Sequence, residues 1–290
     1  MKKTLFTPAK INLYLKITRK RPDNYHELLT LFMPLPDLGD EITFDFDAQA
    51  GISVSCDNAA VPVNQDNICA KAAQKYAEQC NLPLSWHIHI AKRIPIAAGL
   101  GGGSSDAAAV LRILNEHFQL LTAAELNALA AKIGADVPFF LKPRTKIASG
   151  IGEIFTELDK ILPTPPLVLI NPRFPVSAAW CYNHLKTELI GEAEPGELTS
   201  LINAATEKNY LELGKLLRND LAWANFQKFP LLQIIRDFLL EQGSTGVEIS
   251  GSGPTIFAIA QDFAALPRLV AACREKFPDC FIFGTKPDAE

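Results

Sequence analysis

Four glycines within five residues, Gly99 to Gly103, are the feature that most limits what this chain can fold into. Glycine loses more backbone entropy on ordering than any other residue, so a cluster of this density is costly unless bare backbone is needed. The cluster leads into Ser104, Ser105 and Asp106 and then an alanine-rich stretch with apolar residues at helical spacing. We expect a helix here that is capped by one of the two serines and has Asp106 in its first turn.

Bare backbone at the start of a helix is the arrangement that binds phosphate, because N–H groups point at the anion and the helix N-terminus carries about half a positive charge. A tight turn with close packing is the alternative explanation, but one or two glycines would suffice for it. No lysine follows the glycines, as a P-loop requires. Another helix follows where a Rossmann unit has a strand, and protein-kinase motifs are absent. The segment predicts a phosphate loop outside these three common nucleotide folds.

Composition narrows the classes of function. The chain has 290 residues, 48% of them apolar, and a net charge of −4, which argues against a nucleic-acid-binding or polybasic membrane-binding protein. We find no run of about 20 apolar residues and no secretory signal, so we expect a cytoplasmic protein. The six cysteines show no C-x-x-C spacing, which favours free thiols over disulfides or a zinc site.

Strand and helix patterns mix without regular alternation, which predicts an α+β protein of two layers rather than a doubly wound sheet. Residues Ile11–Ile17 alternate in polarity, as in a strand with Asn12, Tyr14 and Lys16 on its solvent face. Asp66 is expected to cap a helix that ends near Cys80. A proline-rich segment begins at Ile161, and we place the boundary there, between domains at 1–160 and 161–290.

Three further stretches offer groups that phosphoryl transfer needs. Lys10 precedes a strand with Asn12 on the same face, although a lysine there is more often solvated. Asp136 lies between Gly134, which suits a helix C-cap, and a proline, so it suits the N-cap of a short helix; a capping carboxylate stays ionised and can also act as a base. The third stretch, Ser250–Ala258, reads SGSGPTIFA and is by itself a turn before a strand.

With the glycine loop, these stretches resemble the GHMP kinase superfamily of galactose, homoserine, mevalonate and phosphomevalonate kinases. PAKINLYLKI from Pro8, IPIAAGLGGGSSDAA from Ile94 and SGSGPTIFA from Ser250 match its three motifs, over almost the whole length. The resemblance implies two domains, each a mostly antiparallel sheet packed with helices, with the active site in the cleft between them. DNYHELLTLF and GADVPFF are most similar to the member that phosphorylates a cytidine-diphosphate-linked methylerythritol in isoprenoid precursor synthesis. That member usually has glycine at Asn24, and asparagine is the best substitute in a left-handed turn.

The resemblance also implies site residues. Asp136 is the expected base or orienting carboxylate, and Lys10 the cation beside the acceptor hydroxyl. The ATP-binding residues it implies are Gly99, Leu100, Gly101, Gly102, Gly103, Ser104 and Ser105 at the phosphates and Asn67, Ile68 and Lys92 near the adenosine. The substrate-binding residues it implies are Asn12, Tyr25, His26 and Tyr182.

ATP and Mg²⁺ are the implied cofactors, with the Mg²⁺ ligand unknown. His87 and His89 share a strand face but lack a third ligand nearby, so we set a metal site there aside. A small-molecule substrate and ATP are the expected partners, with no nucleic acid and no membrane, in a monomer or weak homodimer. The alternatives are another GHMP kinase, of homoserine or phosphomevalonate type, and a non-catalytic nucleotide sensor, which should have lost Lys10 or Asp136.

Overall fold

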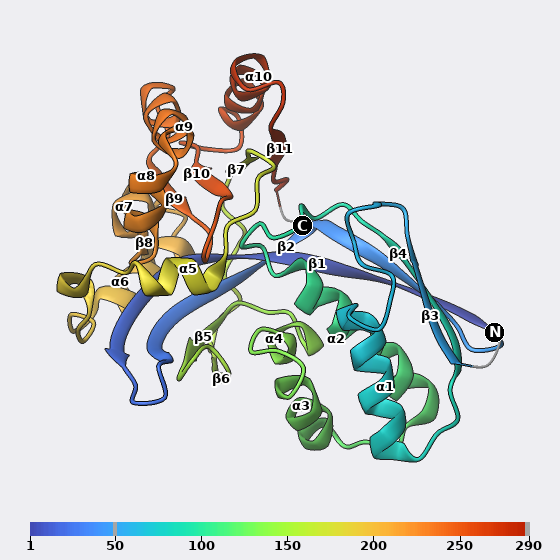
Figure 1. Ribbon diagram of the computed structural model, residues 1–290. Coiled ribbons are helices and arrows are strands. Elements are labelled where there is room, and N and C mark those ends of the chain that lie inside the picture. The colour runs from blue at the N-terminus through green and yellow to red at the C-terminus, as the bar shows by residue number, and fades with distance from the viewer. Residues whose placement is uncertain (49–50, 288–290) are drawn as a thin grey trace. The chain divides into compact units, whose positions relative to one another are not determined.

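The computed structural model describes residues 1–48 and 51–287, and strands and helices follow one another in it without regular alternation (Figure 1). The chain forms two compact units that interleave in the sequence. Unit 1 contains residues 1–9, 38–96 and 101–143, and unit 2 contains residues 10–37, 97–100 and the chain from 144 onward. The expected domain boundary between residues 160 and 161 stays a prediction.

Unit 1 combines a small sheet with four helices. Its strands are the first part of β1 (Lys2–Lys20), β3 (Gly51–Cys56), β4 (Ser85–Ala91) and the last part of β2 (His26–Asp45). Its helices are α1 (Ile68–Cys80), α2 (Gly102–Phe118), α3 (Ala123–Ala131) and α4 (Val137–Leu141). Strand β4 is antiparallel to β2 and parallel to β3. Helix α2 packs against the other three helices, and its Phe118 ring meets Trp86 of β4 at 6.1 Å between centroids. One side of the sheet is thus covered by helix.

The start of α3 is closed by a capping box. The Thr122 side chain accepts from the Glu125 amide, and the Glu125 carboxylate accepts from the Thr122 amide at 2.8 Å. We expect Thr122→Ala to lower the free energy of unfolding by about 1 kcal/mol, since the amide at Glu125 loses its partner. Urea unfolding measures this. Thr122→Ser, which keeps the hydroxyl, is the control, and equal stability of the alanine and serine variants would contradict the assignment.

Unit 2 contains two groups of paired strands. In the first, the part of β1 from Lys10 onward runs parallel to β8 (Arg218–Asn219). The first part of β2 is antiparallel to β5 (Lys146–Ser149), which pairs with β6 (Ile154–Glu157). The second is a four-stranded antiparallel sheet in the order β11 (Phe281–Gly284), β7 (Leu167–Asn171), β10 (Ile256–Ile259), β9 (Gly246–Ile249). The helices of unit 2 are α5 (Ala178–Asn183), a 3-10 helix (Thr187–Leu189), α6 (Glu197–Thr206), α7 (Tyr210–Leu216), α8 (Ala222–Lys228), α9 (Pro230–Glu241) and α10 (Leu266–Lys276).

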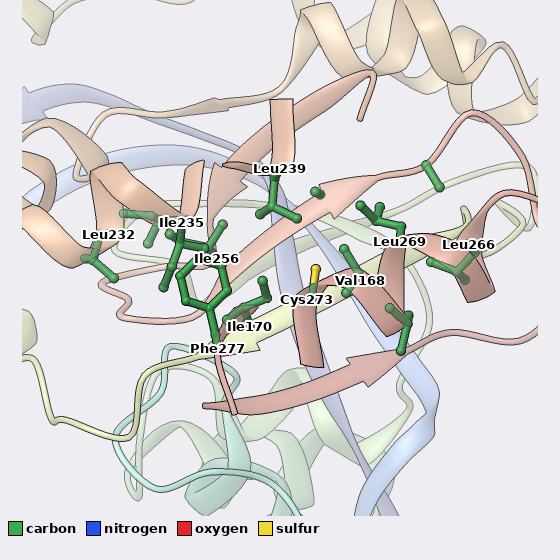
Figure 2. Packing of buried hydrophobic residues seen from close by; sticks show 14 of the residues in the cluster. Val168, Ile170, Leu232, Ile235, Leu239, Ile256, Leu266, Leu269, Cys273 and Phe277 are labelled. Atoms are coloured by element: carbon green, nitrogen blue, oxygen red, sulfur yellow. The ribbon is translucent and has the colours of Figure 1, made fainter. Parts of the chain in front are cut away.

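The four-stranded sheet has its own hydrophobic core, shown in Figure 2. Leu232, Ile235 and Leu239 lie at i, i+3 and i+7 on α9, so they share the helix face that packs on the sheet. Cys273 of α10 and Ile256 of β10 belong to the same buried cluster. Both units therefore combine strands with a layer of helix, which confirms the expected α+β class.

Strand β1 differs from the expectation of a half-buried strand. It is longer than the predicted Ile11–Ile17, and Tyr14 and Lys16 on its supposed solvent face are buried. The Tyr14 hydroxyl donates to Glu197 at 2.9 Å, and Lys16 Nζ donates to the Leu189 carbonyl at 2.6 Å. The polar face is therefore covered by hydrogen-bonding partners within unit 2, which an alternating pattern does not reveal.

Two expected caps are also displaced. Asn67 rather than Asp66 caps α1, because its side-chain oxygen accepts from the Cys69 amide at 2.8 Å. Helix α3 ends at Ala131, so the proposed C-cap at Gly134 is wrong. The six cysteines all lie in the described part of the chain and are free thiols, as expected. None of the described helices is long and apolar enough to cross a bilayer.

Candidate active site

The glycine-rich turn takes the chain from unit 2, at Leu100, into unit 1, at Gly101. Gly99 and Gly101 have φ angles of 76° and 70°, which residues with a side chain rarely adopt. Gly101 is the N-cap of α2, so the left-handed glycine itself begins the helix.

Helix α2 therefore starts earlier than predicted. Gly102 and Gly103 are its first two residues, so they belong to the helix and not to a loop. The expectation that Ser104 or Ser105 caps the helix is wrong, because the preceding backbone turn takes that role. The expectation that Asp106 lies in the first turn is also wrong. The first turn of α2, as the structure describes it, contains no acidic residue, and Asp106 follows it.

The first turn of α2 presents backbone amides. The initial N–H groups of a helix have no carbonyl partner within it, and here they belong to residues 102–104. Ser105 is committed elsewhere: its amide donates to the Gly101 carbonyl, its hydroxyl donates to the Pro8 carbonyl at 2.6 Å, and it also bonds the Thr7 hydroxyl. An anion at this helix start would thus meet the amides of residues 102–104 and the positive end of a seventeen-residue helix.

Within unit 2, residues of the other two sequence motifs donate hydrogen bonds to backbone carbonyls of the glycine-rich turn. The Lys10 amide donates to the Leu100 carbonyl at 3.0 Å, and the Ser250 hydroxyl donates to the Gly99 carbonyl at 2.9 Å. A Cβ on Gly99 would lie 2.0 Å from the Ser250 carbonyl oxygen. The second glycine turn therefore packs directly on the first, and glycine is required at position 99 for this approach.

Lys10 and Asn12 lie side by side on β1 and are buried, and Lys10 is only 4% exposed. Lys10 Nζ donates to Asn12 Oδ1 at 2.8 Å and lies 4.8 Å from the centre of the Phe32 ring. Asn12 Nδ2 in turn donates to Thr30 at 2.8 Å. A Cβ on Gly251 would lie 3.5 Å from Lys10 Nζ. Lys10 is therefore a held cation beside the second glycine turn, not a solvated lysine.

Asp136 lies in unit 1 as the N-cap of α4 and is half-buried. Within the described residues its carboxylate makes no hydrogen bond to the helix amides, so the side chain is not used as a cap. The predicted position of Asp136 is confirmed, and its role as base or orienting group stays a prediction.

The residues expected near the adenosine surround the N-termini of α1 and α2. Asn67 uses both ends of its amide locally, since it accepts from the Cys69 amide and donates to the Pro62 carbonyl. A Cβ on Gly103 would lie 3.7 Å from a methyl group of Ile68, so this side chain covers the first turn of α2. Asn67 and Ile68 thus shape the surroundings of the helix start.

Lys92, the third of these residues, points into the protein. Its ammonium lies 2.6 Å from an oxygen of Asp40 and 2.6 Å from one of Asp106. Burial acts to lower the Lys92 pKa, but the two carboxylates outweigh it and the pKa is raised. For Asp106, burial outweighs the lysine and raises the pKa to about 7. Sequence reasoning missed Asp40, which is 52 residues from Lys92 and carries no local signal of a buried partner.

Tyr25, His26 and Tyr182 contribute aromatic rings to unit 2. Asn24 has a φ of 67°, which confirms the expected left-handed turn and leaves Tyr25 59% exposed. The His26 and Tyr182 rings are stacked, with centroids 5.4 Å apart and planes 19° apart. Burial lowers the pKa of His26, so its imidazole is neutral at pH 7. The structure thus groups His26 with Tyr182 and presents Tyr25 to solvent, available to a flat ligand.

His87 and His89 take part in a hydrogen-bonded row on the sheet of unit 1. Ser53 and Ser55 bond the two ring nitrogens of His87 at 2.8 and 2.9 Å, and Ser55 also bonds His89. Among the described residues there is no group of three histidine, cysteine or acidic side chains that could hold a metal ion.

Comparison with known proteins defines the class of this fold and site. Residues 67–143 match the family model of the GHMP kinases N terminal domain, and residues 201–279 match that of the GHMP kinases C terminal domain. The chain belongs to the GHMP kinases, and ATP is the phosphoryl donor that this class implies.

Comparison with individual relatives narrows the class further. The 4-diphosphocytidyl-2-C-methyl-D-erythritol kinase of Geobacter sulfurreducens is 40% identical over 278 residues, covering 95% of this chain and 96% of the relative. The same enzyme of Geobacter metallireducens is 40% identical over 88% of both chains. Within the GHMP kinases, the chain groups with the 4-diphosphocytidyl-2-C-methyl-D-erythritol kinases.

Comparison with solved structures gives the same grouping. A crystal structure of 4-(cytidine 5'-diphospho)-2C-methyl-D-erythritol kinase matches with a TM-score of 0.83 and 33% identity, covering 99% of this chain and all of that one. Homoserine kinase from Cytophaga hutchinsonii matches with a TM-score of 0.77 but 18% identity, over 99% of this chain and 95% of that one. This second likeness shows the shared fold.

Proposed function

We propose that this protein transfers the terminal phosphoryl group of ATP to the 2-hydroxyl of 4-diphosphocytidyl-2-C-methyl-D-erythritol. The products are the 2-phosphate and ADP, in the non-mevalonate route to isoprenoid precursors. The observation that carries the proposal is 40% identity to enzymes of that name along 95% of the chain. The exposed Tyr25, which precedes His26 in the chain, and the stacked rings of His26 and Tyr182 support a substrate with a flat base.

The residues divide the chemistry among them. The ATP phosphates are assigned to the glycine-rich turn and the amides at the start of α2, where bare backbone and the helix dipole favour an anion. Lys10 is assigned to stabilising negative charge on the group in transfer, because its ammonium is buried and held in one position. Asp136 is assigned to accepting or orienting the proton of the acceptor hydroxyl. Asn12, bonded to Lys10, is assigned to positioning the acceptor.

Mg²⁺ is proposed to enter with ATP and to neutralise charge on its phosphate oxygens. Asp106, the carboxylate nearest the helix start in sequence, is buried and has one oxygen on Lys92, which is a poor fit to an open metal ligand. No protein ligand is therefore assigned. A cytoplasmic location and a monomer or weak homodimer complete the proposal.

An assay of ADP release with Mg-ATP tests the function. Four acceptors are offered separately: the cytidine-diphosphate methylerythritol, homoserine, mevalonate and phosphomevalonate. We expect turnover with the cytidine compound alone. Turnover with another acceptor instead would keep the GHMP class and overturn the substrate assignment. No turnover with any of them, together with tight ATP binding, would favour a nucleotide sensor.

Tyr25→Ala is expected to raise the KM for the cytidine substrate about tenfold or more, with kcat changed by less than about threefold. Stacking of a base on an aromatic ring contributes about 1–3 kcal/mol to binding. Because Tyr25 is assigned to the base and not to the phosphoryl group in transfer, its loss should affect binding more than the chemical step. Steady-state kinetics in the two substrates measure the effect. Tyr25→Phe, which keeps the ring, is the control, and an unchanged KM in the alanine variant would remove Tyr25 from the site.

A further inference from the structure

Unit 1 contains a buried cluster of one cation and two anions that none of the roles above uses. Lys92 follows β4, Asp40 lies on β2 and Asp106 lies on α2. The lysine side chain is 6% exposed, and those of Asp40 and Asp106 are 0% and 5% exposed. The Lys92 ammonium bonds both carboxylates at 2.6 Å. With all three groups ionised, the cluster carries one net negative charge away from water.

The two carboxylates are supported very differently. The second oxygen of Asp40 accepts from the amides of Arg93 and Ile94 at 2.6 and 2.8 Å. The second oxygen of Asp106 is buried and has no hydrogen-bond partner among the described residues. Both oxygens of Asp40 thus accept hydrogen bonds, whereas only one oxygen of Asp106 does, from Lys92. Asp106 is therefore the member of the cluster that gains most from holding a proton.

The cluster lies directly against the first turn of α2. A Cβ on Gly102, the first residue of α2, would be only 3.1 Å from Lys92 Nζ. The Asp106 carboxylate is bonded to this ammonium, so a change of its charge in a buried cluster alters the potential at the amides of the first turn. Whether the cluster is neutral or negative therefore affects how strongly the turn attracts a phosphate.

We propose that Asp106 is a positioning residue whose protonation sets the charge beneath the phosphate-binding turn. When Asp106 is protonated, the cluster is neutral and the affinity for nucleotide phosphates is higher. When Asp106 is ionised, the cluster has a net negative charge and this affinity is lower. This inference rests on the proposed function in taking a nucleotide phosphate as the anion at the start of α2.

The raised pKa of Asp106 supports this proposal. Burial raises the pKa of Asp106 to about 7, so the group changes charge in the physiological range. Two thiols act on the cluster, Cys69 on α1 and Cys56 on β3, and burial raises the pKa of both, so they stay neutral. The Asp57 carboxylate accepts from the Lys92 amide at 2.8 Å and is held ionised by that bond, which lowers its pKa. Asp106 is thus protonated below pH 7 and ionised above it, and nucleotide affinity should fall as pH rises through 7.

Calorimetric titration with Mg-ADP from pH 6 to 8.5 tests the proposal without requiring turnover. We compare the wild-type protein with Asp106→Asn, which keeps the shape and cannot ionise. Glu78→Gln removes the same charge from the exposed face of α1 and is the matched control. Because ADP titrates equally in all three, the ratio of two Kd values isolates the protein group.

The wild-type Kd should rise about two- to tenfold relative to Asp106→Asn between pH 6 and 8.5, with Glu78→Gln following the wild type. Parallel profiles in all three proteins would overturn the role of Asp106 and leave the proposed function intact. Absence of nucleotide binding in all three would overturn both.

A second measurement needs only the wild-type protein, which covers the case of a poorly folded variant. If the bound nucleotide favours protonated Asp106, binding at pH 7.5 must take up a fraction of a proton. Titrations in two buffers of different ionisation enthalpy reveal this uptake as a difference in heat. Equal heats in the two buffers would overturn the proposal.

Discussion

Asp136→Asn is expected to lower turnover about a hundredfold or more while ATP binding and the fold stay unchanged. The amide keeps the size of the carboxylate but accepts no proton, and loss of a general base typically costs this much. Stability should be spared, because asparagine has the same shape as aspartate and the side chain is not used to cap α4. Single-turnover kinetics at saturating ATP separate the chemical step from product release.

The matched control for this variant is Asp66→Asn, a change of the same kind at an exposed site before α1, where the acid side chain is 81% exposed. It should retain the wild-type rate, since surface substitutions of this type are close to neutral. Near-normal turnover in Asp136→Asn would remove Asp136 from the reaction. A loss confined to KM for the acceptor would reduce its role to orientation.

Gly99→Ala should be the most damaging single-methyl change in the phosphate turn. The added Cβ would meet the Ser250 carbonyl oxygen at 2.0 Å, and the φ of 76° is itself unfavourable for alanine. Strain and overpacking together should cost about 2–4 kcal/mol of folding free energy. We also expect turnover to fall about a hundredfold, because the two glycine turns must separate and an ångström-scale misplacement has that effect.

Gly103→Ala provides the structural control. Its Cβ would meet only a methyl group of Ile68, at 3.7 Å, and the residue has ordinary helical geometry. Alanine is favoured over glycine in a helix by about 1 kcal/mol, so this variant should melt at or above the wild-type temperature. Thermal unfolding of the two variants gives the comparison. Equal melting temperatures would show that position 99 tolerates a side chain and that the backbone contact is not rigid.

Local physics was enough to predict much of this fold. The helical spacing of apolar residues in α2 and the left-handed turn at Asn24 are decided by neighbours within a few residues. A helix start was harder to locate, because both the serines and the glycines at 101–105 are plausible N-terminal residues. The backbone conformation of Gly101 decided it, and no sequence rule separates these candidates.

Long-range contacts could not be predicted. Lys10 looked like a solvated lysine until Asn12 and Phe32 were found beside it, and Asp40 had no feature that distinguished it from a surface carboxylate. Burial of charge depends on partners that are dozens of residues away, whereas propensity is local. The resemblance to GHMP kinases selected the right stretches, but it did not show that Lys92 points inward at two acids.

The interleaved units have a consequence for the order in which the protein can fold during synthesis. All of unit 1 lies before residue 144, whereas unit 2 needs residues 10–37 and 97–100 together with the chain from 144 onward. Leu15 and Ile17 of β1 are buried in a cluster with Val176 and Leu221, so they emerge from the ribosome long before these partners exist. These apolar side chains therefore lack part of their final packing during much of translation, which makes this early stretch the natural place for a chaperone to act.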